Sequence, residues 1–447
     1  MANSVHAATV KDTQKAPFPA ATPASAPALS LSRYRYYVLG VIWIVMLLRF
    51  IDLQIVAVLL ESIRAEFQVS DTQLGLLSGT AFAIFYATLG LPVAWLADRH
   101  NRRTIVASCL GLWSLMTALC GMAGSFFTLL LARLGVGVGE AGGAPPSYAL
   151  LSDYFPAHQR STVFAFLNTS VPMGVFAGYI IGGFINASFG WRATMLIIGG
   201  FGVLVALLVW LTVREPVRGS ADGLHAGAAP RFVDTVRYLC GTPAYRHLVC
   251  AASIATLGAA GSGIWIVSFF IRVHELPPVQ VTTWLAFIYG GGGLAGALLG
   301  GFAADRLAKG RRDARWQVWL PALALVSILP FSFFVYLWPN PVAALLVHTC
   351  TTFLMHSWMG PCYGTVQTLA GVARRAMAAA INLLVINLLA LGLGPLLVGA
   401  MSDYFSERFG DDSLRYSILA LVSVTYTWSA VHFLLAGRTI RRDLAAA

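Results

Sequence analysis

The segments WLADRHNRR (95–103) and GFAADRLAKGRR (301–312) decide the fold. In each, an Asp-Arg pair follows an apolar run and opens a short basic turn. The two pairs, at 98–99 and 305–306, lie 207 residues apart, close to half of the 447-residue chain. A turn repeated at this distance predicts a molecule built of two similar halves.

Composition indicates that both halves lie in a membrane. The chain is 57% hydrophobic and only 11% charged, against roughly 25% charged residues in soluble globular proteins. A helix crosses the bilayer core with about 20 mostly apolar residues. Twelve stretches qualify: 36–60, 73–97, 104–124, 126–150, 161–187, 193–213, 247–271, 281–304, 316–337, 341–369, 377–402 and 414–436. We therefore predict an all-α membrane protein, with twelve transmembrane helices in two pseudo-symmetric six-helix bundles.

The polar segments give the expected domain boundaries. The start of the chain is rich in Ala, Pro, Ser and Thr and lacks the apolar core of a signal peptide. A second polar stretch, rich in Gly, Ala and Pro, separates the sixth and seventh spans. The predicted organisation is a disordered tail (1–32), an N-terminal bundle (33–213), a linker (214–245), a C-terminal bundle (246–436) and a C-terminal tail (437–447).

The formal charge of +11 has a topological origin. If the N-terminus is cytoplasmic, 23 of the 30 Lys and Arg residues lie in cytoplasmic tails and loops, 5 lie in the opposite loops, and Arg49 and Arg133 lie within spans. This asymmetry is the positive-inside bias. It predicts cytoplasmic termini, tails and linker, fits a bacterial inner membrane, and removes the reason to expect a nucleic-acid partner.

Motifs for cofactors and catalysis are missing from the sequence. The six cysteines form no C-x-x-C pair and are interpreted as reduced packing residues. GVGEAG (137–142) lacks the preceding strand of a nucleotide site, and no Walker A, H-E-x-x-H or G-x-S-x-G motif occurs. We expect no enzyme, no metal and no cofactor other than protons as the coupling ion. Both halves lie in one chain, so a monomer is sufficient.

Four charged residues lie well inside apolar spans, away from the span ends: Arg49, Asp52, Arg133 and Glu140. A charge at the bilayer centre costs at least about 2.5–3.5 kcal/mol, so such residues are expected to pair and to face a cavity. Spacings of three and seven put each pair of charges on one helix face. We hypothesise that Asp52 or Glu140 carries a proton and that Arg133 is its counter-ion. Arg49 either contacts substrate or neutralises Asp52, and the alternative for the whole set is a static salt-bridge network.

Other side chains within spans are weaker candidates. His348 and His356 lie eight residues apart in the tenth span and either relay protons or bond structurally to neighbours. Aromatic residues either line an apolar cavity or pack between helices. The aromatic candidates are Phe82, Phe85, Tyr86, Tyr148, Trp265, Trp358 and Tyr363. The predicted substrate cavity combines Arg49, Arg133 and Glu140 with Tyr86, Tyr148, Trp265 and Trp358.

The repeated basic turns predict gates. Asp98 is expected to bind the free backbone N–H groups at the start of span 11, and Asp305 those of span 5. Arg102 and Arg103 can reach Asp153 at the end of span 4. Arg99 and Arg306 complete the two Asp-Arg pairs. The alternative is that these charges only fix the topology.

Several segments carry a resemblance to a known family. They are LADRHNRR (96–103), residues 133–161, VPMGVFAGYIIGG (171–183), FGWR (189–192) and VREPVRG (213–219). They resemble the major facilitator superfamily and are most similar to its Spinster branch of lipid transporters, over nearly all of 36–436. Asn101 replaces the usual glycine of the superfamily motif, a Spinster-like feature. Leu53 follows the span-1 aspartate where that branch commonly has arginine, and Arg49 lies one turn earlier.

The resemblance and the repeat together imply a function. Repeated halves are typical of secondary transporters, which bind substrate near the midplane between them. The resemblance implies the major facilitator fold and alternating-access, proton-coupled transport of an amphipathic lipid, either a lysophospholipid or a sphingosine-1-phosphate-like molecule. A transporter of small organic solutes or drugs is the alternative. Membrane enzymes, receptors and channels are less favoured, because no catalytic set is present and channel pores usually need oligomeric rings.

Overall fold

The computed structural model describes residues 28–216, 232–371 and 374–445, and all regular elements in these ranges are helical. The N-terminal half contains α1 (Ala28–Phe67), α2 (Asp71–Gly75), η1 (Leu76–Thr80), α3 (Ala81–Arg99), α4 (Arg102–Gly121), α5 (Phe126–Glu140), α6 (Ala144–Tyr154), α7 (Ala157–Asn168) and α8 (Ser170–Thr212). The C-terminal half contains α9 (Phe232–Gly241), α10 (Pro243–Arg272), α11 (Pro278–Phe287), η2 (Ile288–Gly293), α12 (Leu294–Gly310), α13 (Trp316–Leu337), α14 (Pro341–Ser357), α15 (Met359–Ala370), α16 (Arg375–Ile386), η4 (Asn387–Leu391), α17 (Gly392–Phe409), η5 (Gly410–Asp412) and α18 (Ser413–Ala445).

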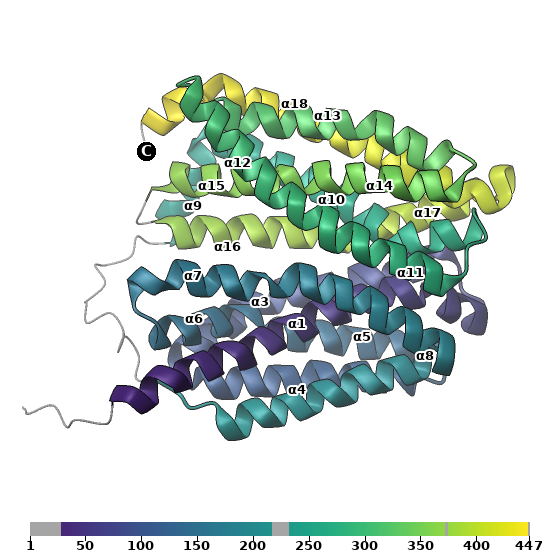
Figure 1. The fold of residues 1–447 in the computed structure, drawn as a ribbon, viewed down its shortest axis with the longest axis horizontal. Coiled ribbons are helices and arrows are strands. Elements are labelled where there is room, and N and C mark those ends of the chain that lie inside the picture. The colour runs from purple at the N-terminus through teal and green to yellow at the C-terminus, as the bar shows by residue number, and fades with distance from the viewer. Residues whose placement is uncertain (1–27, 217–231, 372–373, 446–447) are drawn as a thin grey trace, which may run out of the picture.

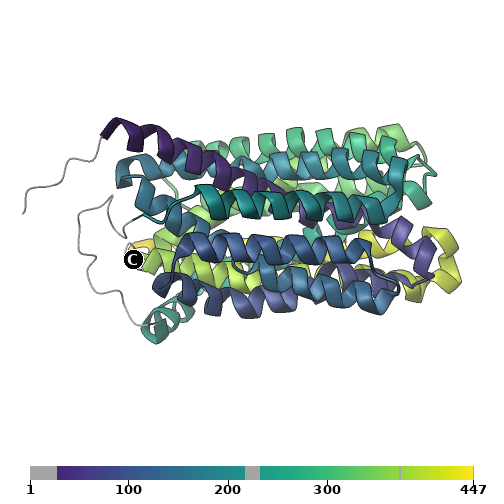
Figure 2. The ribbon, with the colours of Figure 1, turned by 90° about the horizontal axis from the view of Figure 1, so that it is seen from below.

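The two halves lie side by side, with their helices running roughly along the long axis of the molecule (Figure 1). Figure 2 shows the same arrangement from below. The start of α1 and the end of α18 lie at one end, together with the turns 100–101 and 311–315 (Figure 1). We call this the basic end. The opposite end, with the turns 68–70 and 273–277, is the far end.

Glycines reverse the chain at two places within long helical stretches. Ten stretches of the described chain are long and apolar enough to cross a membrane, and two of them span 51 and 65 residues. The first breaks at Gly190 (φ 80°) and the second at Gly410 (φ 54°), in a backbone region that favours glycine. Figure 1 shows the chain turning back within α8. Because one crossing needs about 20 residues, each of these two stretches has room for two of the twelve predicted crossings.

Helix continues into the predicted tails and linker. The first 27 residues of the predicted tail lie outside the described residues, but α1 already begins at Ala28, directly after the last proline of that segment. The predicted C-terminal tail is a continuation of α18, where Asp443 accepts a 2.9 Å hydrogen bond from the backbone amide of Ala244. The linker contains α9, whose Tyr238 ring lies 4.3 Å from the guanidinium carbon of Arg374. Tertiary contacts thus attach part of the predicted linker and of the predicted C-terminal tail to the bundle.

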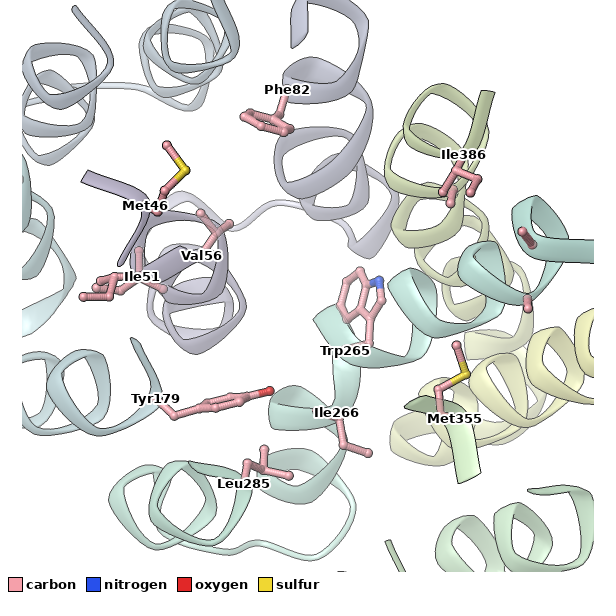
Figure 3. Packing of buried hydrophobic residues seen from close by; sticks show 14 of the residues in the cluster. Met46, Ile51, Val56, Phe82, Tyr179, Trp265, Ile266, Leu285, Met355 and Ile386 are labelled. Carbon is pink, nitrogen blue, oxygen red and sulfur yellow. The ribbon is translucent and has the colours of Figure 1, made fainter. Parts of the chain in front are cut away.

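Buried apolar side chains fill the centre of each half and line the space between the halves. Figure 3 shows Met46, Ile51 and Val56 on α1, and Trp265 and Ile266 on α10. Tyr179 extends from α8 toward α10 in the same view (Figure 3). These helices therefore form the inner surfaces on which a site between the halves can be built.

Candidate functional site

The four charged residues within the spans form two separate ion pairs in the N-terminal half. Arg133 of α5 donates to Asp52 of α1 over 3.1 Å, and the hydroxyl of Thr117 donates to the other Asp52 oxygen over 2.8 Å. Glu140 accepts from Arg49 over 3.1 Å. Arg49 therefore neutralises Glu140, whereas Asp52 is neutralised by Arg133.

The two carboxylates differ in how completely they are bonded. Asp52 and Glu140 are both buried, with 2% and 0% of their surfaces exposed. The second oxygen of Glu140 has no hydrogen-bond partner among the described residues, whereas each Asp52 oxygen has one. A buried oxygen without a partner gives up little when it binds a proton. Glu140 therefore keeps one buried oxygen available for a proton or another donor.

A cavity of about 310 Å³ lies between the halves. Its N-terminal wall consists of Phe50, Leu53, Gln54, Ser78, Phe82, Val175 and Tyr179. Its C-terminal wall includes Tyr289, Tyr336, His348, Met355, His356 and Tyr426. Among the described residues that line it there is no Asp, Glu, Lys or Arg. The cavity is therefore an uncharged space whose apolar and aromatic lining also carries many hydroxyl, imidazole and amide groups.

Phe82 separates the cavity from the ion pairs. Its ring lines the cavity and lies 5.9 Å from the Arg133 guanidinium carbon. Tyr86 stacks on Phe82 at 5.4 Å between ring centroids and accepts a 2.8 Å hydrogen bond from Arg49. A change at the Arg49–Glu140 pair can thus reach the cavity wall through two stacked rings.

None of the predicted cavity residues is among the described residues that line this cavity. Arg49, Arg133, Glu140 and Tyr86 stand behind Phe82, not on the cavity surface. Of the other candidates, Tyr148 donates to Asn168 over 2.8 Å.

The two predicted tryptophans are packing residues. Trp265 donates to the Pro395 carbonyl over 2.9 Å, and Trp358 lies 6.0 Å from the rings of both Tyr363 and Phe433. Both indoles are fully buried within the C-terminal half. Large aromatic side chains in membrane helices more often pack or anchor the helix than line a cavity. Neither tryptophan is among the described residues that line this cavity.

The basic end holds one of the expected gate contacts. Arg102 forms an ion pair with Asp153, whereas the guanidinium of Arg103 lies 5.5 Å from the Trp210 ring. The backbone amides of Arg102 and Arg103 donate to Glu215 over 2.9 and 2.8 Å, so Glu215 caps α4. This cap was not among the predictions.

Of the two predicted contacts between the bundles, that of Asp98 lies outside the described residues and that of Asp305 is not seen among them. The Asp98 side chain lies outside the described residues, and Arg99 is exposed at the end of α3. Asp305 and Arg306 are exposed, and Asp305 accepts a 2.7 Å hydrogen bond from Gln317 of its own half, not from the start of span 5. In the nearby turn, Arg441 and Arg315 hold the pKa of Asp313 well below its usual range.

The far end carries an ion-pair cluster that the sequence analysis did not identify. Arg272 at the end of α10 contacts Glu61 at 2.8 Å and Asp71 at 2.7 Å. Asp403 of α17 accepts hydrogen bonds of 3.0 and 2.8 Å from the amides of Asp71 and Thr72 at the start of α2. We call these five residues the far-end clasp. In the sequence the charged residues of the clasp are visible only as charges at the ends of apolar spans. The fold shows that they contact one another.

The clasp joins the two halves. Two further hydrogen bonds cross between the halves, one from Ser402 to Asp71 and one from Thr80 to the Gly392 carbonyl. All of them lie toward the far end of the bundle. The described contacts therefore close the far end of the space between the halves.

Gly75 gives a test of this closure. A Cβ atom at Gly75 would lie 2.5 Å from the Pro395 carbonyl oxygen and 2.8 Å from the Leu396 Cα. We expect Gly75→Ala to push α2 and α17 apart, because the clashing atoms belong to the backbone and cannot move aside as a flexible side chain does. The rate at which a thiol reagent labels a cysteine introduced at the far end should then rise severalfold. Gly90→Ala is the control, because nothing lies within 4 Å of its Cβ position. Equal labelling of both variants would contradict the closure.

Comparisons with known proteins agree with this architecture. The family model of the Major Facilitator Superfamily matches residues 42–395. An "MFS-type efflux pump" of Mycolicibacterium smegmatis is 32% identical over 418 residues, covering 92% of this chain and 95% of the relative. "Protein spinster homolog 1" of Xenopus tropicalis is 24% identical over 84% of this chain and 74% of its own length.

The solved structures point to the same relatives. The crystal structure of a bacterial homologue of the human lysosomal transporter Spinster, inward-facing and unoccupied, matches with a TM-score of 0.84 and 29% identity, covering 92% of this chain and 98% of that one. The occupied inward-facing form of that homologue matches with a TM-score of 0.81 and 28% identity over the same shares of both chains. The chain is a multi-pass membrane protein of the major facilitator superfamily of transporters, with Spinster proteins among its relatives.

Proposed function

We propose that this chain is a proton-coupled secondary transporter that moves an amphipathic lipid, such as a lysophospholipid or a sphingosine-1-phosphate-like molecule, by alternating access. The observation that carries the proposal is the position of two buried ion pairs directly behind an uncharged cavity between the halves. Buried charges are costly and mark functional pathways in membrane proteins. A transporter needs both a coupling group and a substrate space, and here the Phe82–Tyr86 stack connects them.

Glu140 is the proposed proton carrier. A proton binds its unpartnered oxygen, Glu140 becomes neutral, and Arg49 loses its anionic partner. Arg49 then depends on Tyr86 and on any acceptor that substrate brings, because the guanidinium stays charged. Asp52 keeps its contacts with Arg133 and Thr117 in this scheme and holds α1 against α5 and α4.

The ends of the bundle supply the proposed gates. If the basic end is cytoplasmic, as the charge distribution predicts, the clasp closes the external side and the structure is an inward-facing state. In the outward-facing state the clasp opens, and Asp98 and Asp305 bind the helix starts of the opposite half. We propose a bacterial plasma membrane, cytoplasmic termini and a monomer, with membrane lipids as the surrounding partners.

A small organic solute or drug is the second candidate substrate. It is favoured by the Mycolicibacterium relative, whose name is that of an efflux pump and which is aligned over nearly its whole length. The lipid candidate is favoured by the Spinster relatives and by the aromatic lining of the cavity. Both candidates use the same coupling site.

Transport in proteoliposomes tests the proposal. A labelled lysophospholipid is presented under an imposed pH gradient, and uptake is compared with and without the gradient. Accumulation that depends on the gradient supports the lipid carrier. If the lysophospholipid neither moves nor competes with a transported small solute, the lipid assignment is wrong and the second candidate stands.

A further inference from the structure

Three polar side chains form a stripe along one face of α14. His348, Thr352 and His356 are spaced four residues apart, which places them on successive turns of the helix. All three line the cavity. His348 is 7% exposed and Thr352 is 3% exposed. The His348 Nε2 and the Thr352 hydroxyl have no hydrogen-bond partner among the described residues. Buried polar atoms of this kind normally have partners, so the stripe has unused capacity facing the cavity.

The hydrogen bonds of the two imidazoles determine which ring nitrogen carries a hydrogen and which can accept one. The Nδ1 of His356 lies 2.8 Å from the Thr352 carbonyl oxygen, which can only accept, so this nitrogen carries the hydrogen. The Thr351 hydroxyl lies 2.9 Å from both the carbonyl oxygen and the Nδ1 of His348. Both contacts can be hydrogen bonds only if the hydroxyl donates its single hydrogen to the carbonyl, which can only accept, and itself accepts from Nδ1. In both neutral rings the Nε2 is then a hydrogen-bond acceptor.

The surroundings favour neutral rings. No Asp or Glu is present among the described residues that line the cavity, so no carboxylate there compensates an imidazolium. An imidazolium there would have neither an anion nor a free lone pair to bind and is therefore disfavoured. The neighbours on the adjacent element are Tyr289 of η2, 5.7 Å from His348 and 6.4 Å from His356, and Gly293 of η2, whose Cβ position lies 3.3 Å from the His356 ring. π-helical turns such as η2 occur frequently at functional sites.

We propose that His348, Thr352 and His356 form a hydrogen-bond-accepting subsite for the protonated amine of the transported molecule. Two lone pairs on one helix face suit a group with several N–H donors. The cavity also presents Tyr179, Tyr289, Tyr336 and Tyr426, and aromatic rings attract cations. This inference rests on the proposed function and deepens it, since it names the headgroup chemistry that the cavity selects.

Two ligands of equal charge and chain length test the subsite. Dodecylammonium has three N–H donors, and dodecyltrimethylammonium has none. Binding to the full-length protein in nanodiscs is measured by calorimetry at one pH without a gradient. We expect the primary amine to bind at least about tenfold more tightly than its trimethyl analogue, because its donors satisfy the stripe. Equal affinities, or tighter binding of dodecyl phosphate than of either cation, would overturn the proposal.

Variants assign the preference to the stripe. The double variant His348→Phe/His356→Phe is expected to reduce the preference to within about twofold, whereas His348→Gln/His356→Gln keeps part of it through the amide oxygens. His432→Phe is the matched control, because His432 pairs with His247 away from the cavity lining. A preference unchanged in the double Phe variant overturns the assignment. Each variant must first show the thermal unfolding midpoint of the parent protein. If the double Phe variant is unstable, the double Gln variant is used in its place, and it should show a preference below that of the parent.

This experiment is separable from the test of coupling. It needs no proton gradient and no transport, so loss of gradient-driven uptake with an intact amine preference counts against the proton coupling alone. Intact gradient-driven uptake without an amine preference counts against the subsite alone.

Discussion

Glu140→Gln is expected to lower pH-gradient-driven accumulation of substrate at least about tenfold. Glutamine keeps the size of the side chain and can still contact Arg49, but it cannot bind and release a proton. Substrate exchange across a membrane without a gradient should persist, because the cavity residues are unchanged. Uptake and exchange in the same proteoliposomes separate the two effects.

Asp52→Asn provides the contrast. Removing one partner of a fully buried ion pair costs about 3–5 kcal/mol, because the other charge is left uncompensated. Arg133 would be that charge, so we expect this variant to lose thermal stability in detergent. Glu140→Gln should lose less, since Arg49 also bonds Tyr86 and its side chain is 11% exposed. If Glu140→Gln accumulates substrate normally while a folded Asp52→Asn protein does not, Asp52 and not Glu140 carries the proton.

Arg272→Met is expected to open the far end of the molecule. One guanidinium contacts two carboxylates, Glu61 and Asp71, and their pairing with it crosses from one half to the other. Its removal leaves the two carboxylates with Arg64 alone, which is half-exposed and lies 3.7 Å from Asp71, a loss of about 3 kcal/mol for a partly buried pair. An equilibrium between closed and open states would shift by roughly a hundredfold.

Spin labels at the exposed residues Ala65 and Glu407, in a background without the six native cysteines, report this opening as a distance across the far end. Arg192→Met is the matched control, because Arg192 pairs with Glu66 at the same end but within one half. We expect the control to keep the parent distance distribution. If Arg272→Met also keeps it, the clasp does not hold the halves closed.

Much of the architecture follows from the sequence alone. Apolar length and the scarcity of charge predict membrane helices, since the bilayer imposes a fixed span on any helix that crosses it. The repeated Asp-Arg turns predict two halves. The cost of burying charge identifies Arg49, Asp52, Arg133 and Glu140 as a set without any knowledge of their neighbours.

The pairing within that set was decided by tertiary structure. Spacing along a helix says which residues share a face, and it gave Arg49 and Asp52 as possible partners. Which carboxylate an arginine reaches depends on how α1, α4 and α5 are placed, and this placement gives Asp52 to Arg133 and Glu140 to Arg49. The cavity lining depended on the same information, because an aromatic side chain in a membrane helix packs or faces a cavity according to its neighbours. Trp265 and Trp358 pack, whereas Phe82, His348 and His356 line the cavity.

The far-end clasp shows the limit most clearly. Glu61, Asp71, Arg272 and Asp403 are ordinary charges at helix ends in the sequence, and up to 342 residues separate them. Only the packing of the two halves brings them within hydrogen-bond distance. Local sequence determines which residues form helices and which surfaces avoid water. The interactions between distant charges arise from the relative placement of those helices, which no local pattern encodes.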